Sequence, residues 1–502
     1  MPIFTLTMLA KFVIAISIFL VAYLVRLNSL LKGVPQRVQE LRDPGWTTEQ
    51  LTKSYRELED RSFDYSTHVP PRLNRRYIVT GGNGLVGGYI VLQLLARGTP
   101  PEHIRIIDIR APERNDLKTG QAVHVDYIPT DIRSRASVDA AFDKPWPPSA
   151  VKLPLTVFHT AAVILASDRS KHLYGFPEAV NVRGTENVMK AAQRVGADIF
   201  SSTSSASISI HPVRPFVFFS KEPGHFWQVL DEQDFQKPLR PHQEFFGNYA
   251  ASKAVAERIV CNANCASFRT GCIRPANGVY GNATDNTVGG PLSSTVFPTW
   301  VSHIVQSFVH GANVALAHLQ HEEVLVSGAV SQSGRPFVVT DPNPPISYRD
   351  LYKAIATLSV HPFHPVTLQP VLMLLMSHLV EWYNLLPYRV PFLRRIIPEL
   401  KGDVKHLQPA LFSICTHLIG SDADARKPVA EGGLGYKGMV TTLEGMVMEI
   451  IEWNREHRKE QGGGARKSYT TSVSLAEKLR VMAPDFVAPS GNVAIRIADR
   501  AK

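Results

Sequence analysis

A tyrosine and a lysine four residues apart are the pair in this sequence best suited to acid–base chemistry. Tyr249 and Lys253 lie in the segment NYAASKAVAE (248–257), and their spacing of four places them on one face of a helix. A free phenol has a pKa of about 10, so it is a poor base near neutral pH until a neighbouring cation stabilises the phenolate. With Lys253 as that cation, Tyr249 could take the proton from a substrate alcohol.

A run of hydroxyl side chains, FSSTSSAS (200–207), could supply a second group to the same reaction. The run is expected to end a strand, where a serine hydroxyl would orient the oxygen of the substrate. The residues alone do not decide between the adjacent Ser204 and Ser205. Because a Tyr-x-x-x-Lys spacing also occurs by chance on solvated helices, its meaning depends on the elements around it.

A strand, a tight turn and a helix are predicted in the segment RRYIVTGGNGLVGGYIVLQLLARG (75–98). Its three spaced glycines meet the structural requirements of a dinucleotide-binding turn. Gly81 allows the tight turn, Gly84 lets the backbone approach a pyrophosphate, and Gly87 lets the helix pack closely on the strand. The pattern therefore indicates a phosphate cradle.

The start of this helix and the end of the following strand are predicted to hold the dinucleotide. The first helical turn, with Leu85 and Val86, offers unpaired backbone N–H groups to phosphate. The next strand, IRIIDIR (104–110), carries Asp108 about twenty residues beyond the turn, where an acid hydrogen-bonds the ribose hydroxyls. A carboxylate there would repel a 2′-phosphate, which favours NAD over NADP, although Arg110 keeps NADP as the alternative.

The pattern TGGxGxxG resembles the extended short-chain dehydrogenase/reductase superfamily, as do VFHTAA (157–162), VNVRGTENVMKAA (180–192) and RPANGVYG (274–281). The resemblance implies an NAD(P)-dependent oxidoreductase, and aligning the hydroxyl run with the family's Ser-Ser-Ala form favours Ser205 beside Tyr249 and Lys253 as the catalytic set. It also implies further cofactor contacts: Asp131 and Ile132 around adenine, Ala161 beside the cofactor, Tyr249 and Lys253 at the nicotinamide ribose, and Pro275 beside nicotinamide.

Later segments resemble the 3β-hydroxysteroid dehydrogenase branch of that superfamily. These are VLDEQDFQKPLRP in the insertion, SFVHGANVALAHL (307–319) and SGRPFVVTDPNPPISYRDLY (333–352). ARKPVAEGGLGYKGMVTTLEG (425–445) is similar to the C-terminal region of fungal-type sterol-4α-carboxylate 3-dehydrogenases (decarboxylating). This resemblance implies oxidation of a 3β-hydroxyl by NAD, followed by loss of CO₂ from the resulting β-keto acid.

An apolar segment at residues 3–25 is long enough to cross a bilayer as a helix, although Lys11 interrupts it. A cleaved signal peptide and a buried helix are the alternatives, but no small-residue cleavage site follows directly. More basic residues follow the segment than precede it, which places the remainder of the chain in the cytosol. Together with the sterol resemblance, this predicts a single-pass anchor in the endoplasmic reticulum membrane.

The chain is predicted to be an α/β protein with a Rossmann-type doubly wound parallel sheet, a smaller and largely C-terminal substrate domain, and an N-terminal membrane-anchor helix. The predicted parts are an anchor (1–28), a juxtamembrane spacer (29–74), the NAD-binding domain with the catalytic residues (75–281, insertion 211–247), mainly the substrate domain (282–460), and a flexible basic tail (461–502). The apolar stretch 366–386 is either a helix lying in the membrane interface or a core helix of the substrate domain.

The composition excludes several other classes of protein. The 502 residues include 44% hydrophobic and 20% charged side chains, which are the proportions of a folded chain. The net charge of +10 is scattered rather than interleaved with aromatic residues, so nucleic acid is not expected as a partner. Four cysteines without metal spacing favour a reducing compartment, and the pairs His318/His321 and His361/His364 lack a supporting acid, so no metal is expected.

Four functions remain open at this point. The first is the sterol or steroid dehydrogenase, and the second is a dehydrogenase or reductase of a triterpenoid or another hydrophobic secondary alcohol. The third is a reductase or epimerase acting on a polar substrate, and the fourth is a non-catalytic NAD-binding scaffold. The expected partners are a sterol or triterpenoid substrate and the membrane; a homodimer and association with other sterol-pathway enzymes are further expectations.

Overall fold

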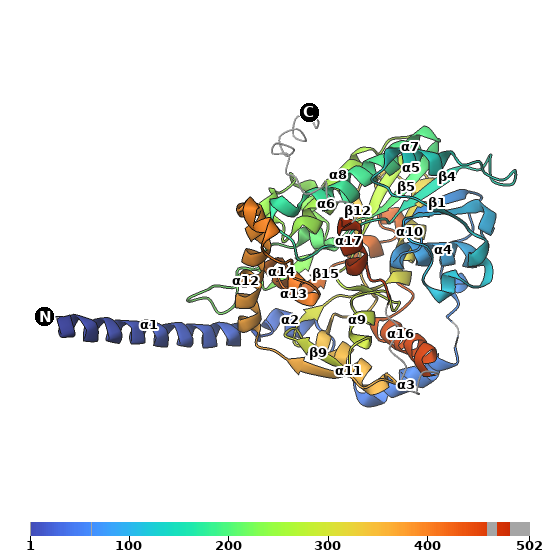
Figure 1. Cartoon of the computed structure of the whole chain (residues 1–502). Helices are drawn as coiled ribbons and strands as arrows, with labels where there is room; N and C mark the ends of the chain where they lie inside the picture. Colours follow the sequence, from blue (N-terminus) through green and yellow to red (C-terminus); the bar gives the residue numbers. More distant parts are fainter. Residues whose placement is uncertain (1, 62, 459–468, 482–502) are drawn as a thin grey trace.

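The computed structural model describes residues 2–61, 63–458 and 469–481, and it confirms the predicted doubly wound α/β fold (Figure 1). Seven parallel strands form the central sheet in the order β12-β7-β5-β4-β1-β2-β3. Their bounds are β1 (Arg76–Thr80), β2 (Ile104–Asp108), β3 (Asp126–Pro129), β4 (Leu155–His159), β5 (Ala197–Thr203), β7 (Arg269–Pro275) and β12 (Pro336–Val339). The inner strands β4 and β5 are almost entirely buried because helices cover both faces of the sheet.

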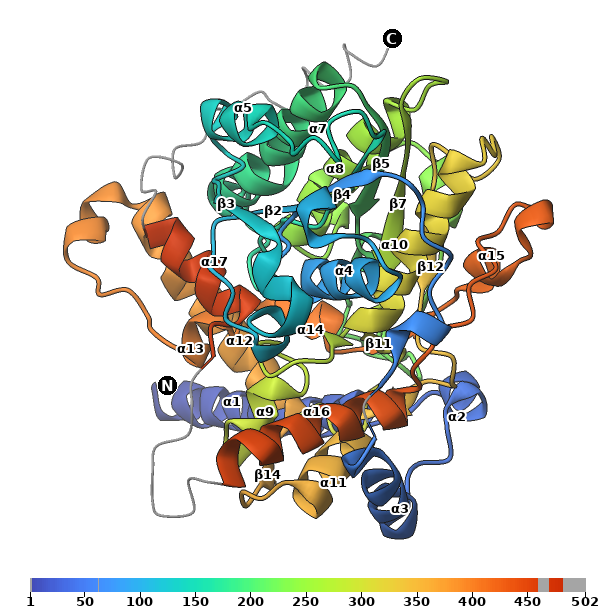
Figure 2. The same ribbon diagram turned by 90° about the vertical axis from the view of Figure 1, so that its right-hand side faces the viewer.

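Successive side chains of β1 point to opposite faces of the sheet, as the pleat requires. Tyr77 and Val79 pack with α4 (Leu85–Ala96) and α10 (Gly311–Val326). Ile78 packs on the other face with α5 (Arg135–Asp143), α7 (Thr185–Arg194) and α8 (Asn248–Asn262). Figure 2 shows α4 beside α10, with α5, α7 and α8 together on the other side of the strands.

The predicted boundary of the NAD-binding domain at residue 281 is wrong, because the sheet takes its last strand from later in the chain. Strand β12 pairs in parallel with β7, so α10 and β12 complete the nucleotide-binding half. Conversely, the insertion, which was predicted within the NAD-binding domain, contributes a strand to the other half of the molecule. Its strand β6 (Trp227–Leu230) joins a second sheet of order β13-β10-β15-β6. The other strands of that sheet are β10 (Val305–Gln306), β13 (Ile346–Ser347) and β15 (His417–Gly420).

Short elements complete the second half of the molecule. Two ladders of two strands pair β8 (Val279–Tyr280) with β11 (Val309–His310) and β9 (Val296–Thr299) with β14 (His364–Thr367). The short helices are α6 (Gly175–Pro177), α9 (Gly289–Leu292), α13 (Asp403–His406), α14 (Pro409–Ile414) and α15 (Ala423–Arg426).

The segment predicted as a juxtamembrane spacer is folded into the second half of the molecule. It contains α2 (Gln36–Leu41) and α3 (Thr48–Glu59), and α3 begins with a capping box between Thr47 and Gln50. Leu51 is fully buried in a cluster contributed mainly by α11 (Tyr348–Leu358) and α16 (Thr442–His457). Figure 1 shows α3 beside both helices. The high charge of the segment therefore reflects the solvent-facing side of a packed helix.

The N-terminal helix α1 (Pro2–Leu31) projects away from the rest of the molecule (Figure 1). It is long and apolar enough to cross a membrane, and its apolar window is not buried. Its inner end is packed: Leu27 and Leu31 contact Val371 and Leu374 of α12 (Pro370–Arg389). One face of α12, predicted as either an interfacial or a core helix, thus belongs to the core.

The predicted flexible tail contains a docked helix, α17 (Ser472–Val481). Ala476 is fully buried against the nucleotide-binding half, and the Arg480 guanidinium lies 3.2 Å from the Asp168 carboxylate. This part of the tail prediction is wrong. Residues 461–468 and 482–502 lie outside the described residues.

We expect Leu51→Ala to lower the free energy of unfolding of the full-length protein by about 2–4 kcal/mol, because it leaves a cavity in the core of the second half. Denaturant unfolding followed by circular dichroism would measure the change. Lys53→Ala on the same helix is the control, because that side chain is 76% exposed. Equal stabilities of the two variants would mean that α3 is a loosely attached spacer.

Candidate active site

A cavity of about 340 Å³ lies at the carboxyl ends of the parallel strands, where open α/β sheets bind ligands. Every site residue predicted from the sequence lines this cavity: Gly81, Gly84, Leu85, Val86, Gly87, Asp108, Asp131, Ile132, Ala161, Ser205, Tyr249, Lys253 and Pro275. The structure therefore brings the predicted cofactor residues and the predicted catalytic residues into one space.

The glycine turn leaves no room for side chains. Gly81 has a φ of +70°, in the left-handed region that favours glycine. A Cβ on Gly87 would lie 2.3 Å from the carbonyl oxygen of Gly81, so helix α4 can approach the turn only with glycine there. Gly84 precedes the first turn of α4, whose backbone N–H groups have no partner within the helix. These features fit a pyrophosphate.

Asp108 ends β2 with its carboxylate held by backbone donors. One oxygen accepts from the N–H of Asn83 at 3.0 Å, and the other accepts from the N–H of Arg110 at 2.9 Å. Burial raises the pKa of Asp108, and the nearby Arg110 opposes this effect. The Arg110 side chain also lies beside Gly84, where a Cβ would come within 2.9 Å of its guanidinium. Both groups that distinguish NAD from NADP are therefore at the cavity.

Helix α17, in the predicted flexible tail, contributes a wall of the cavity that was not expected from the sequence. Leu475 and Leu479 of α17 line it together with Ile132. Ala476, between them, is buried in the cluster that contains Ile132 and Val163. The two leucines four residues apart were the available signal of an amphipathic helix, but the polar and basic surroundings favoured a flexible tail.

Tyr249 and Lys253 lie on α8 and are both at least nine-tenths buried. The ammonium of Lys253 donates to the carbonyl oxygen of Thr203 at 2.6 Å, and burial lowers its pKa to about 8. Burial raises the pKa of the Tyr249 phenol, while a hydrogen bond with Ser205 lowers it. Tyr249 is thus hydrogen-bonded to Ser205, a residue of the predicted hydroxyl run.

The structure separates the two adjacent serines. Both serines line the cavity, and the Ser205 hydroxyl lies 2.7 Å from that of Ser207. Ser204 is buried, and its hydroxyl donates to the Glu257 carboxylate at 2.6 Å. Ser204 is therefore engaged by α8, whereas Ser205 contacts Tyr249.

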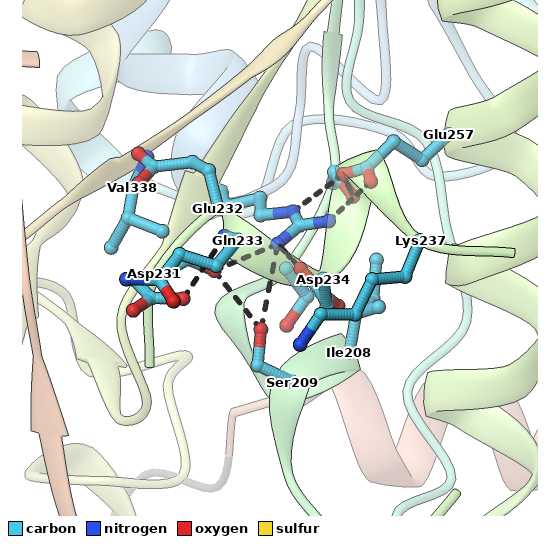
Figure 3. Close-up of polar contacts among 12 residues, drawn as sticks. Ile208, Ser209, Asp231, Glu232, Gln233, Asp234, Lys237, Glu257 and Val338 are labelled. Carbon is cyan, nitrogen blue, oxygen red and sulfur yellow. Dashed lines mark hydrogen bonds and ion pairs between the residues drawn. The ribbon is translucent and has the colours of Figure 1, made fainter. Parts of the chain in front are cut away.

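A buried ion pair ties α8 to β7. Arg274 donates from Nη2 and Nε to the two carboxylate oxygens of Glu257 at 2.6 and 2.8 Å, and both side chains are only 1% exposed. Its Nη1 donates to Asp234 and to the carbonyl oxygen of Asp231, at 2.6 and 2.9 Å. Figure 3 shows Glu257 on one side of the guanidinium and Asp231, Asp234 and Ser209 on the other. The acidic stretch of the insertion thus holds the helix that carries Tyr249 and Lys253.

This network was missed from the sequence, although Glu257 follows Lys253 by four residues on the same helix face. A second link to α8 is Asn181, whose side chain bonds both backbone groups of Val163 and the Ser252 hydroxyl. It connects the loop after β4 with the residue that precedes Lys253.

The two histidines of AHLQH lie inside the core behind the hydroxyl run. His318 bonds Ser201 and Thr203 at 2.8 and 2.7 Å, and His321 bonds the same Ser201 at 2.9 Å. Burial lowers the pKa of both imidazoles, that of His321 to about 4. Their contacts hold the strand that carries the serines.

The glycine cradle, the acid at the end of β2 and the Ser, Tyr and Lys side chains define an NAD(P)-dependent oxidoreductase of the short-chain dehydrogenase/reductase type. The model of the 3-beta hydroxysteroid dehydrogenase/isomerase family matches residues 78–364, more than half of the chain. The protein belongs to this family.

Known proteins are similar to the chain at low identity. Short-chain dehydrogenase/reductase family 42E member 1 of Xenopus laevis is 25% identical over 62% of this chain and 75% of its own. Sterol-4-alpha-carboxylate 3-dehydrogenase erg26, decarboxylating, of Schizosaccharomyces pombe is 27% identical over 60% of this chain and 80% of its own. The crystal structure of gox2253 aligns with a TM-score of 0.50 at 18% identity, over 76% of this chain and 98% of its own, which supports the fold.

We expect Leu479→Ala to weaken NADH binding by about fivefold, because it removes an apolar side chain from the wall of the cavity that also contains the glycine turn. Titration of NADH fluorescence with the full-length protein would give the dissociation constant. Lys478→Ala is the control, since the neighbouring lysine is exposed on the same helix. An unchanged constant for Leu479→Ala would show that α17 does not cover the cofactor.

Proposed function

We propose that the protein oxidises the 3β-hydroxyl of a sterol or steroid to a 3-ketone with NAD, and that it releases a 4α-carboxylate as CO₂. One observation carries the proposal: Ser205, Tyr249 and Lys253 line the same cavity as the dinucleotide cradle. The family supports hydroxysteroid oxidation, and the similarity to a decarboxylating sterol enzyme supports the loss of CO₂.

The side chains divide the oxidation between them. NAD, which the glycine turn and Asp108 would hold, would supply the acceptor for the hydride of the carbinol carbon. The Tyr249 phenolate takes the hydroxyl proton, while Ser205 donates a hydrogen bond to the same oxygen. Lys253, held against the Thr203 carbonyl at 2.6 Å, places a positive charge one helical turn from Tyr249 on α8 and favours the phenolate.

Decarboxylation then needs little further machinery. A 4α-carboxylate beside a 3-ketone is a β-keto acid, so the electrons of the breaking C–C bond pass to the ketone oxygen as CO₂ leaves. Tyr249, now protonated, and Ser205 donate hydrogen bonds to the developing enolate oxygen. Protonation of the enolate carbon gives the 4-decarboxylated ketone.

The walls beside the catalytic residues suit a large apolar substrate. Ile164, Ala166, Phe246 and Ile414 line the cavity near Ser205 and Tyr249. Ligand sites of this kind are mostly apolar, with few polar groups that orient the ligand. This lining supports a sterol rather than a polar substrate.

Charged side chains support both the choice of NAD as the cofactor and the orientation of the protein in the membrane. We assign NAD because the Asp108 carboxylate, which two backbone N–H groups hold at the end of β2, would repel a 2′-phosphate. We assign the catalytic domain to the cytosolic face of the endoplasmic reticulum membrane because the basic residues Arg26, Lys32 and Arg37 follow the apolar segment 3–25.

The detergent-solubilised protein should form NADH and release CO₂ when it is given NAD and a 4α-carboxy-3β-hydroxysterol. Tyr249→Phe should reduce both rates by about a thousandfold or more while NADH binding is retained, because only the proton acceptor is lost. NADH formation with a 3β-hydroxysteroid or triterpenoid alcohol, and none with the carboxysterol, would assign another hydrophobic alcohol. Full activity of Tyr249→Phe would refute the mechanism.

Substitution of the two adjacent serines should separate catalysis from stability. We expect Ser205→Ala to lower kcat by about a hundredfold at nearly unchanged unfolding free energy, because its hydroxyl contacts the reacting oxygen. Ser204→Ala should instead lower the unfolding free energy by about 1–3 kcal/mol, because it leaves a buried carboxylate oxygen with one donor fewer. Steady-state kinetics and denaturant unfolding of both variants test this, and the reverse pattern would assign Ser204 as the catalytic serine.

A further inference from the structure

We propose that an apolar collar around the base of α1 inserts into the cytosolic leaflet, so that the molecule rests on the bilayer and is not merely tethered to it. The collar consists of Phe218 and Phe219 in the loop 214–220 and Leu372, Met376, Leu379 and Trp382 of α12. All six side chains are large, apolar and solvent-exposed, and Phe219 is 98% exposed.

The four α12 residues form one stripe. Their spacing of four, three and three residues places them on a single face of the helix, whereas Val371, Leu374 and Val380 on the other face are buried. A soluble surface rarely leaves such a stripe uncovered. Because one apolar face of α12 already packs in the protein core, its exposed apolar face needs a second apolar environment.

The loop is held against both membrane-proximal helices. Arg214 and Gly224 pair as an antiparallel bridge that closes it. Phe218 stacks on Tyr23 of α1 with ring centroids 5.0 Å apart, and the Arg26 guanidinium donates to the carbonyl oxygen of Ser220 at 2.8 Å. Phe216 contacts His378 of α12 with a centroid distance of 5.9 Å. The exposed phenylalanines are thus fixed beside the anchor.

The arrangement of the helices identifies the occupant of this surface as lipid. Figure 1 shows α12 running across the inner end of α1, with the loop beside it on the side toward which α1 projects. If α1 crosses the bilayer, a helix lying across its base is oriented along the membrane surface. Arg389, Arg394 and Arg395 at the end of α12 and just after it are exposed, which suits anionic headgroups beside an inserted apolar face.

The collar also lies next to the catalytic cavity. The short helix α14 carries Ile414 into the cavity wall and Phe412 into the cluster of Leu27, Leu374 and their neighbours. One helical turn therefore separates the reaction site from the membrane side of the molecule. Insertion of the collar would place the substrate cavity at the edge of the bilayer, from which a sterol could enter without crossing water.

The native Trp382 can test this in the full-length protein, without an activity assay. In dioleoylphosphatidylcholine vesicles, we expect bromine on the acyl chains to lower the Trp382 emission by about twofold, since an inserted indole lies among the chains. The emission of Trp382 is obtained by subtracting that of Trp382→Phe, which retains the other tryptophans. Equal emission in brominated and unbrominated vesicles would overturn the proposal.

A second reporter tests the loop independently. In the Trp382→Phe background, Phe219→Trp should be quenched by brominated lipid, while Val330→Trp should not, because Val330 is 77% exposed but lies in the loop after α10. Absence of quenching at Phe219→Trp would overturn insertion of the loop. Protection of Trp382 from iodide that rises with protein concentration, without bromine quenching, would assign the face to a second copy of the chain and also overturn the proposal. Because none of these readings depends on turnover, failure of the sterol reaction would leave them unaffected.

Discussion

The buried ion pair between Arg274 and Glu257 fixes the helix on which the chemistry depends. Both side chains are 1% exposed, so their attraction must offset the cost of removing two charges from water. Breaking such a pair by removing one partner typically costs about 3–5 kcal/mol, because the other charge is left buried and uncompensated. Glu257 lies one helical turn after Lys253, and Lys253 one turn after Tyr249. A rotation of α8 that moved the tyrosine out of the cavity would therefore break the ion pair.

The network around Arg274 and Glu257 also explains why the insertion carries an acidic stretch. Asp234 and the Asp231 carbonyl accept from Nη1 of Arg274, and the neighbouring Glu232 accepts from the backbone N–H of Val338 in β12. The insertion thus joins the last two strands of the sheet to the catalytic helix. Both serines line the cavity, but the Ser204 hydroxyl donates to the same Glu257, whereas the Ser205 hydroxyl bonds Tyr249. The structural network therefore engages the hydroxyl of one of the two adjacent serines and leaves the other for Tyr249.

Local patterns in the sequence were sufficient for the glycine turn, the acid at the end of β2 and the catalytic residues predicted to line the cavity. The glycine spacing, Asp108 and the Tyr-x-x-x-Lys pair each depend on geometry within one turn or one helix, and all of these residues line one cavity. Relations between distant segments were not predictable in this way. Strand β12 fills a sheet edge only because β7 leaves it open, and Leu51 is buried only because α11 and α16 arrive from residues far along the chain. The leucines of α17 were visible, but nothing local shows which surface they cover.

The position of the cavity relative to the anchor links fold to function through the cost of exposing an apolar substrate to water. At about 25 cal/mol per Å² of apolar surface, transfer of a rigid polycyclic alcohol from lipid to water is strongly unfavourable. A protein that took such a substrate from solution would depend on a minute free concentration. Here α14 contributes to the catalytic cavity through Ile414 and to the packing around the inner end of α1 through Phe412. Under the proposed function, the packing of α1 against α12 and α14 would therefore also determine which wall of the active site faces the lipid.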